Sequence, residues 1–476
     1  MSQGSPESEA WFREPWPPLT ASYPGESSEY DLLVIGEPTP AIAAAIESAT
    51  ETQRVAMVIP GAAEPGPPSL FDATWQALQQ SARLANSVRT AEWLQQSPTK
   101  SAIVDFGAVV ERLRHVQLAG ARRASTWRLL GHGVDVYRGA VRFIASHGIE
   151  LGEPDDAVPH GISGDNVLRI GCRRCVLVVG RQPNAAAIDG LTEVGYRLPA
   201  SILERHDLPR RAAVLGAGSQ ACMLAQALRR FGSDVHLIAS QDALLSGEAP
   251  EVSQVIRRQF ERESIHLRLG CEVTRVERTG DAKGIILACG DQRTKVFVDD
   301  IFLTASTTTR HDRLDLDAAL VRTAGEQIAV DDHFRTSNPA IFAIPDSVAT
   351  IAIANLTTPR FDSGCEKVLR TIYTDPEVAQ LGLTPAEADR RGIAIDIHYP
   401  ECALPDDAML ENGAERFAMA YTRKDDGRLS GATVVGANAA AYMPQLQQVL
   451  ASRPRRTGIA GVRRVMMRVL RGRLHA

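Results

Sequence analysis

The chain has 476 residues, of which 44% are hydrophobic and 23% charged, and a net charge of −5. This composition is typical of a soluble globular protein with several cores, and the negative charge argues against a nucleic-acid-binding protein. The charge is unevenly spread, because residues 1–29 carry five Glu and one Arg whereas residues 451–476 carry eight Arg and no acid.

The absence of targeting signals and the pattern of cysteines indicate where in the cell the protein is located. The acidic N-terminus lacks the apolar core of a signal peptide, and no run approaches the ~20 apolar residues of a spanning helix. The cysteines are odd in number and scattered, which argues against a secreted disulfide framework. We therefore expect a cytoplasmic protein with no transmembrane segment. The cysteines are Cys172, Cys175, Cys222, Cys271, Cys289, Cys365 and Cys402.

The N-terminal residues 1–29 are rich in Pro, Ser and Glu, which predicts a disordered arm. Trp11, Phe12 and Trp16 are unusual in such a segment. They are expected either to dock on the chain's own surface or to form a linear motif for a protein partner.

The first glycine loop follows a predicted strand within the sequence YDLLVIGEPTPA at residues 30–41. Gly36 occupies the first position of the dinucleotide fingerprint GxGxxG, but Pro38 and Ala41 replace the second and third glycines. Proline has no N–H to offer a pyrophosphate, and its ring fills the space that the phosphate needs. The pattern predicts a strand and a helix that keep the fold and lose phosphate binding.

The second glycine loop is better preserved. A predicted strand from Ala212 leads to Gly216, Gly218 and Ala221, which satisfy GxGxxG/A before a helix. The next strand ends at Ala239 and Ser240, so neither an acid for the ribose nor an arginine for a 2′-phosphate stands there. Two interpretations remain open, a nucleotide site or a turn that only packs helix on strand.

The alternation of strands and helices predicts an α/β protein with doubly wound parallel sheets. Five ordered blocks make the prediction specific, because together they resemble the pyridine nucleotide-disulfide oxidoreductase family, which includes dihydrolipoamide dehydrogenase and mercuric reductase-like flavoproteins. The blocks are LPRRAAVLGAGSQACMLAQALRRFGSDVHLI, PEVSQVIRRQFERESIHLRLGCEVTRVERTG, TSNPAIFAIPD, YTDPEVAQLGLTPAEADRRGI and LSGATVVGANA.

The resemblance covers about residues 30–450 and implies two Rossmann-like dinucleotide-binding domains and a C-terminal α+β dimerisation domain. It implies a split FAD-type domain at residues 30–202 and 309–358, an NAD-type domain at 203–308 and a dimerisation domain at 362–452. A homodimer would form through residues 362–450. In this family a hydride passes from NAD(P)H to FAD, and electrons then reach a cysteine pair.

The same resemblance implies the cofactor contacts. For FAD these are Gly36, Gly180 and the ribityl-binding Asp346, while Pro60 replaces the acid that would hold the adenosine ribose. For NAD(P)H they are Gly216, Gly218 and Ala221. We expect a weakened FAD site and weak binding of NAD(P)H.

The catalytic positions of the family are altered, so no catalytic residue is assigned. No cysteine precedes Cys172, and the redox dithiol is therefore missing. Met223 stands where the family has a Glu that faces the flavin, and His475 lacks the family's C-terminal motif and its following Glu.

Cys172 and Cys175 form a C-x-x-C whose flanking arginines would favour a reactive thiol. This pair enters a predicted strand, where positions three apart point to opposite faces. We expect ordinary strand residues rather than a redox pair, and no metal site because no second ligand pair stands at zinc spacing.

Residues 453–476 form a basic tail. Apolar residues from Ile459 recur at helical spacing with arginines on the opposite side, which predicts an amphipathic helix. It is expected to pack on its own domain, to bind a protein partner or, behind these, to bind anionic lipid or nucleic acid.

These losses favour a non-catalytic homodimeric scaffold or regulatory pseudoenzyme. One alternative is an FAD/NAD(P)H-dependent oxidoreductase with a non-disulfide acceptor. Another is a peripheral binding protein that acts through the Arg-rich tail.

Overall fold

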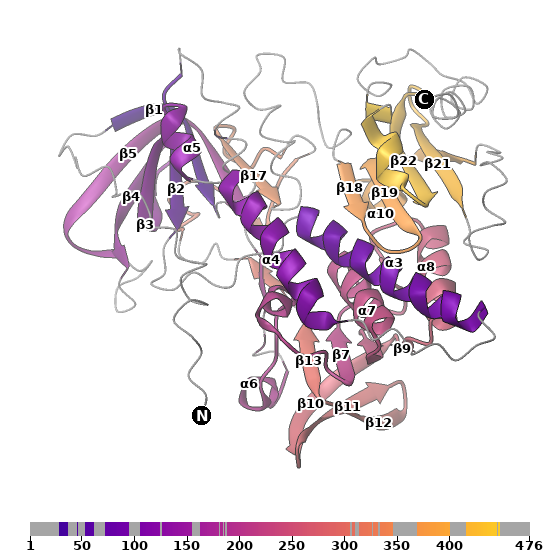
Figure 1. Ribbon diagram of the computed structural model, residues 1–476. Coiled ribbons are helices and arrows are strands. Elements are labelled where there is room, and N and C mark those ends of the chain that lie inside the picture. The colour runs from indigo at the N-terminus through magenta and orange to yellow at the C-terminus, as the bar shows by residue number, and fades with distance from the viewer. Residues whose placement is uncertain are drawn as a thin grey trace. The chain divides into compact units, whose positions relative to one another are not determined.

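The computed structural model (Figure 1) divides the chain into two compact units. Unit 1 comprises residues 1–66, 121–181 and 309–364, and unit 2 comprises residues 67–120, 182–308 and 365–476. The structure describes residues 28–36, 45, 53–60, 72–94, 105–123, 126–154, 162–179, 181–183, 185, 188–304, 307–309, 314–325, 327–331, 334–345, 369–399, 416–444 and 446–447.

Unit 1 is built on one six-stranded sheet. Parallel pairings join its strands in the order β17, β5, β1, β2, β3, and β3, β4 and β5 continue as an antiparallel meander. Residues 32–36 are buried without interruption, as expected for a strand inside a parallel sheet. The strands are β1 (Ser28–Gly36), β2 (Val55–Pro60), β3 (Asp135–Ala145), β4 (Gly148–Pro154), β5 (Ile162–Val179) and β17 (Ile341–Pro345).

A buried carboxylate joins the three strands of the meander. The side chain of Glu150 on β4 is 7% exposed, and its Oε2 accepts hydrogen bonds from Arg142 Nε at 3.0 Å and Nη2 at 2.6 Å. Its Oε1 accepts another from Arg169 Nε at 3.1 Å. Burial works to raise the pKa of Glu150, but the two arginines outweigh it and lower the pKa below its ordinary value.

Within unit 2, residues 211–303 contain a second parallel sheet, with strands in the order β13, β7, β8, β9. Two helices of this part and a three-stranded antiparallel meander, β10–β11–β12, accompany it. The elements are β7 (Arg211–Leu215), α7 (Ser219–Phe231), β8 (Asp234–Ile238), α8 (Pro250–Arg262), β9 (His266–Arg268), β10 (Cys271–Thr279), β11 (Ala282–Cys289), β12 (Gln292–Val298) and β13 (Asp300–Leu303).

The C-terminal part of unit 2 is an antiparallel sheet in the order β18, β19, β22, β21, β20. A capping box between Thr384 and Glu387 begins the short helix α10. Together with the two parallel sheets, this sheet confirms the predicted α/β architecture with a C-terminal α+β part. The elements are β18 (Leu369–Ile372), β19 (Glu377–Gly382), α10 (Pro385–Arg390), β20 (Ile395–His398), β21 (Phe417–Arg423) and β22 (Leu429–Gly436).

The remaining elements are helices and two small two-stranded sheets, β6 with β14 and β15 with β16. Helix α3 lies alongside α7 within unit 2 (Figure 1). No described helix combines the length and the apolar character that crossing a membrane requires. The elements are α3 (Asp72–Leu94), α4 (Phe106–Arg123), α5 (Thr126–Gly131), β6 (Arg181–Pro183), α6 (Leu191–Val194), η3 (Pro199–Glu204), β14 (Thr307–Thr309), β15 (Thr323–Ala324), β16 (Gln327–Ile328) and η7 (Ala439–Tyr442).

A buried arginine ties the parts of unit 2 together. Arg230 on α7 has a side chain that is 2% exposed and pairs with Glu263 at 2.7 Å and with Asp375 at 2.9 Å. The amide of Gln226, one turn earlier, exchanges two hydrogen bonds of 2.8 Å with the backbone of Asp375. Arg83 of α3 donates to the carbonyl of Thr374 at 2.9 Å.

A disulfide joins Cys271 to Cys289 across the hairpin of β10 and β11. The two residues are paired in register, with Cα atoms 4.3 Å apart. The scatter of cysteines along the chain gave no sign of this bond, because the pairing depends on the hairpin register rather than on sequence spacing. An odd, scattered set of cysteines speaks against a framework of several bridges, but it is compatible with one bridge within a hairpin.

The acid stability of unit 1 depends on Glu150. The pKa of Glu150 is lower in the folded chain than its ordinary value of 4.5 in the unfolded chain. Its contribution to the free energy of unfolding is therefore fully present above pH 4.5 and is lost as the pH falls through the folded-state pKa. We expect Glu150→Gln to lower the free energy of unfolding by roughly 1–2 kcal/mol at pH 7 and to flatten its decline in acid. Denaturant titrations at several pH values measure this, with the exposed Glu29→Gln as control. Parallel acid profiles for wild type and Glu150→Gln would contradict it.

The hairpin disulfide is expected to stabilise unit 2 against unfolding. Its cysteines are separated by 18 positions, and closing a loop of that size contributes about 3 kcal/mol. Dithiothreitol should therefore lower the melting temperature of the wild-type chain but not that of the Cys271→Ser/Cys289→Ser double variant, in scanning calorimetry. An equal shift in both proteins would show that the reductant acts elsewhere.

Candidate dinucleotide-binding site

The best-formed candidate site is the loop between β7 and α7. Gly216 follows the last residue of β7 with a φ of +135°, a conformation that favours glycine. Its N–H donates to the carbonyl of Ile238 at 2.8 Å, and Ala217 accepts a hydrogen bond from the N–H of Leu245 at 2.8 Å. These bonds fix the loop before helix α7 begins at Ser219.

The N-terminus of α7 is open. Gly218 is the N-cap residue and makes no side-chain cap, and Gly218, Ser219 and Gln220 are exposed. A Cβ atom added at Gly218 would meet no heavy atom within 4 Å. Helix N–H groups without a side-chain cap attract an anion, so this end of α7 fits a dinucleotide phosphate.

The third position of the fingerprint serves packing. Ala221 is fully buried in the core cluster between α7 and the sheet. A larger side chain there would hold the helix away from β7 and β8. Gly216, Gly218 and Ala221 thus lie together as the sequence predicted, and the nucleotide interpretation gains support from the open space at Gly218.

The ribose side of the site carries a residue that sequence reasoning missed. Beyond Ile238 at the end of β8 lie the buried Ala239 and the exposed Ser240, so no acid stands there, as expected. No arginine stands there either, but Arg268 ends the neighbouring strand β9 in register with Ile238. The Arg268 carbonyl accepts from the N–H of Ala239 at 3.0 Å. Only strand pairing could reveal it, since the two segments are far apart in sequence.

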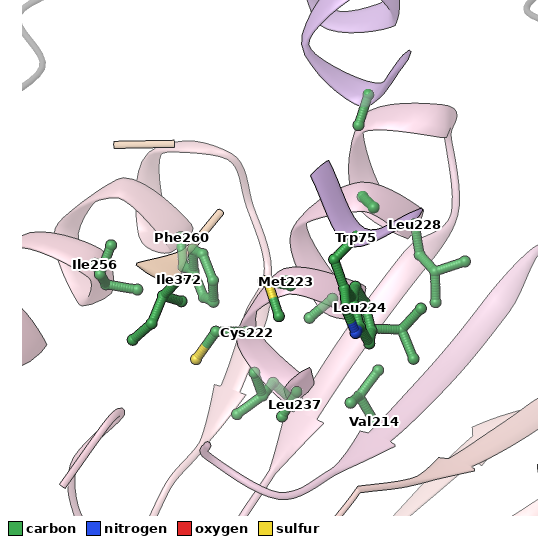
Figure 2. Packing of buried hydrophobic residues seen from close by; sticks show 14 of the residues in the cluster. Trp75, Val214, Cys222, Met223, Leu224, Leu228, Leu237, Ile256, Phe260 and Ile372 are labelled. Atoms are coloured by element: carbon green, nitrogen blue, oxygen red, sulfur yellow. The ribbon is translucent and has the colours of Figure 1, made fainter. Parts of the chain in front are cut away.

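Met223, the residue at the family's glutamate position, lies inside a hydrophobic core. It is 4% exposed and belongs to a cluster that also contains Trp75 of α3 and Ile372 of β18 (Figure 2). Its carbonyl accepts a hydrogen bond from Gln79 Nε2, and its sulfur accepts one from the N–H of Tyr373 at 3.4 Å. Contacts from α3 and β18 therefore leave Met223 almost no access to solvent.

Among the FAD-type residues, the structure describes Gly36 and Pro60. A Cβ atom at Gly36 would lie 2.6 Å from both Cβ and the carbonyl oxygen of Val178, so the close approach of β1 and β5 alone requires glycine. Pro60 is exposed at the end of β2. Gly180 and Asp346 lie outside the described residues, as do Pro38 and Ala41.

Cys172 and Cys175 are free, buried residues of β5, which agrees with their prediction as strand residues. The expectation that they point to opposite faces was wrong, because both side chains lie in the same hydrophobic cluster. Strand β5 changes partners here: Cys172 N donates to His147 O, and Cys175 N donates to Ala340 O. Burial and the contact with Cys172 raise the pKa of Cys175, which suits an inert thiol.

Two protein-family models match the sequence of the chain. A model of pyridine nucleotide-disulphide oxidoreductases matches residues 30–366, and one of the corresponding dimerisation domain matches residues 368–454. The predicted arm at residues 1–29 falls almost wholly outside the described residues, and the predicted tail at residues 453–476 does so entirely.

Individual relatives agree with these matches. The mercuric reductase of Bacillus cereus is 23% identical over 381 residues, covering 77% of this chain and 58% of that protein's length. The mercuric reductase of Streptomyces lividans is 25% identical over 426 residues, covering 86% and 87%. The structure of the HOCl-induced flavoprotein disulfide reductase RclA from Escherichia coli matches with a TM-score of 0.65 at 17% identity, covering 89% of this chain and 94% of RclA.

The burial of Met223 predicts how this position responds to substitution. Met223→Leu keeps the volume and should cost less than about 1.5 kcal/mol of stability. Met223→Glu, which restores the family's residue type, buries a carboxylate without a partner and should cost about 3 kcal/mol or more. Urea unfolding followed by circular dichroism measures both. Equal stability of the two variants would mean that the position is open to solvent.

Proposed function

Because the chain belongs to the pyridine nucleotide-disulphide oxidoreductase family, we propose that it is a member without disulfide reductase activity. It acts as a homodimeric scaffold or regulatory subunit that binds NAD(P)H at the β7–α7 loop. The burial of Met223 in the core is the observation that carries this proposal.

The thiol chemistry of the chain supports the loss of activity. Disulfide reduction needs an accessible thiolate that attacks a sulfur. The sequence has no cysteine before Cys172, where the family's dithiol would stand. The three free cysteines that the structure describes, Cys172, Cys175 and Cys222, are all buried, and burial raises the pKa of Cys222 well above its ordinary value.

The position of Met223 removes a second requirement. A thioether cannot take up or release a proton, and it offers only a weak hydrogen-bond acceptor. The cluster around it is held by the hydrogen bond of Gln79 and by the packing of Trp75. Any carboxylate at this position would lose its hydration without gaining a partner.

The nucleotide loop supports retained binding. The residues that would hold NAD(P)H are Gly216, Gly218 and the first turn of α7, which offer N–H groups to the phosphates, with Arg268 near the adenosine ribose. When bound, the nicotinamide supplies a hydride. The charge of Arg268 would favour the 2′-phosphate of NADPH over NADH.

An alternative is an FAD/NAD(P)H-dependent oxidoreductase that passes electrons to an acceptor other than a disulfide. The open N-terminus of α7 favours it as much as it favours a regulatory site. Oxidation of NADPH by the purified protein with a quinone or ferricyanide acceptor distinguishes the two. Turnover above the rate without protein would support the oxidoreductase and contradict the scaffold.

The remaining expectations concern location and partners. The cytoplasmic location and binding by the N-terminal arm or the Arg-rich tail stay predictions. So does a weak FAD site at Gly36, Gly180 and Asp346.

Purified protein is expected to be colourless and to bind NADPH. An absorption spectrum should show no flavin at one per chain, because Pro38 and Pro60 remove the phosphate and ribose contacts. In calorimetry, Gly218→Ala should weaken NADPH binding at least tenfold, about 1.4 kcal/mol, without loss of stability, since its methyl group enters only the phosphate approach. Gly247→Ala, equally unobstructed, is the control. A stoichiometric flavin would overturn the proposal, and equal binding by both variants would place NADPH elsewhere.

The matched dimerisation domain predicts a homodimer through residues 362–450. Light scattering at micromolar concentration should give twice the chain mass of 51.5 kDa. The mass of a single chain would remove the scaffold hypothesis.

A further inference from the structure

Three side chains with metal-ligating atoms meet on the edge of the second parallel sheet. Asp234 and His236 stand two positions apart on β8 and therefore share one face of the strand. His266 on the edge strand β9 pairs in register with His236. One ligand atom from each of Asp234, His236 and His266 lies within 4.8 Å of the other two.

The contacts within this group leave ligand capacity unused. The imidazole rings of His236 and His266 are stacked, with centroids 4.6 Å apart and planes at 20°. His266 Nε2 lies 3.1 Å from Asp234 Oδ1. His236 Nδ1 is buried and has no hydrogen-bond partner among the described residues. A buried polar nitrogen without a partner calls for an explanation. Here it belongs to a ring that lies beside a second imidazole and a carboxylate, and a bound metal ion would give this nitrogen a partner.

We propose that Asp234, His236 and His266 bind a divalent transition-metal ion such as Zn²⁺. Two imidazole nitrogens and one carboxylate oxygen are ligands that first-row transition ions prefer, whereas Mg²⁺ and Ca²⁺ prefer oxygen alone. Three protein ligands leave further coordination positions to water.

Binding an ion requires a small movement of side chains that are half exposed. In tetrahedral coordination with bonds of about 2.1 Å, the ligand atoms lie roughly 3.4 Å apart. The three ligand atoms must therefore move closer together, and the two stacked imidazole rings must turn away from their parallel arrangement. The side chains of His266 and Asp234 are 49% and 50% exposed, so surrounding protein atoms leave space for both to turn toward His236. The backbone of β8 and β9 can remain as it is.

This metal site is separate from the dinucleotide loop. In parallel strands all amino ends lie at one edge of the sheet and all carboxyl ends at the other. Asp234 begins β8, whereas the glycine loop and Ile238 lie at the carboxyl ends. The ion would therefore fasten the edge strand β9 to β8 without contacting a nucleotide, and its binding should stabilise unit 2 by mass action.

The test uses the full chain, stripped with a chelator and titrated with Co²⁺ or Zn²⁺ alone. Co²⁺ should give visible ligand-field bands that saturate at one ion per chain, and Zn²⁺ should displace it and raise the melting temperature. Mg²⁺ should do neither. His266→Ala and Asp234→Asn, both at half-exposed positions, should each weaken Zn²⁺ binding at least about tenfold in calorimetry. The exposed His206→Ala is the matched control, and circular dichroism checks that each variant is folded.

Three results would overturn the proposal. The first is a wild-type chain without Co²⁺ bands, and the second is bands that persist unchanged in His266→Ala. The third is an equal loss of affinity in His206→Ala, which would place the ion on other histidines of the chain.

Discussion

Unit 2 depends on one buried cation. The buried side chain of Arg230 pairs with Glu263, which follows α8, and with Asp375, which precedes β19. A guanidinium in that position is tolerated only while both carboxylates are present, since a buried charge without a partner is strongly destabilising. The nucleotide-type sheet, α7 and the C-terminal antiparallel sheet are therefore held as one body, and α3 joins it through Arg83 and the cluster around Met223.

This arrangement depends on contacts within the chain and not on a bound cofactor or substrate. Residues that carry the fold, such as Arg230 and the packing alanine Ala221, contact other parts of the same chain. Residues that contact only a cofactor or substrate do not contribute to the fold in this way, so a packing side chain can stand at such a position without loss of the architecture. Met223 is the plainest case, because a position that would hold a carboxylate instead completes a hydrophobic cluster (Figure 2).

Much of the architecture could be predicted from sequence, since it depends on local patterns. Apolar strands before glycine loops predicted both parallel sheets, and the spacing of Gly216, Gly218 and Ala221 located the turn into α7. The features that were missed depend on which strands become neighbours. Arg268 meets the end of β8, and His236 meets His266, only through the pairing of β8 with β9. The Cys271–Cys289 bond likewise requires the register of a hairpin, and β5 brings Cys172 to Cys175 only where it changes partners.

Gly36 shows that one position of the dinucleotide fingerprint is required by the fold itself. Its hydrogen atom stands where any side chain would collide with Val178, so the strand pairing demands glycine whether or not a nucleotide is ever bound. A substitution elsewhere that removed only ligand contacts would leave this steric requirement in place. The first glycine of the fingerprint therefore identifies the strand pairing of this fold, and it does not by itself indicate that a nucleotide binds.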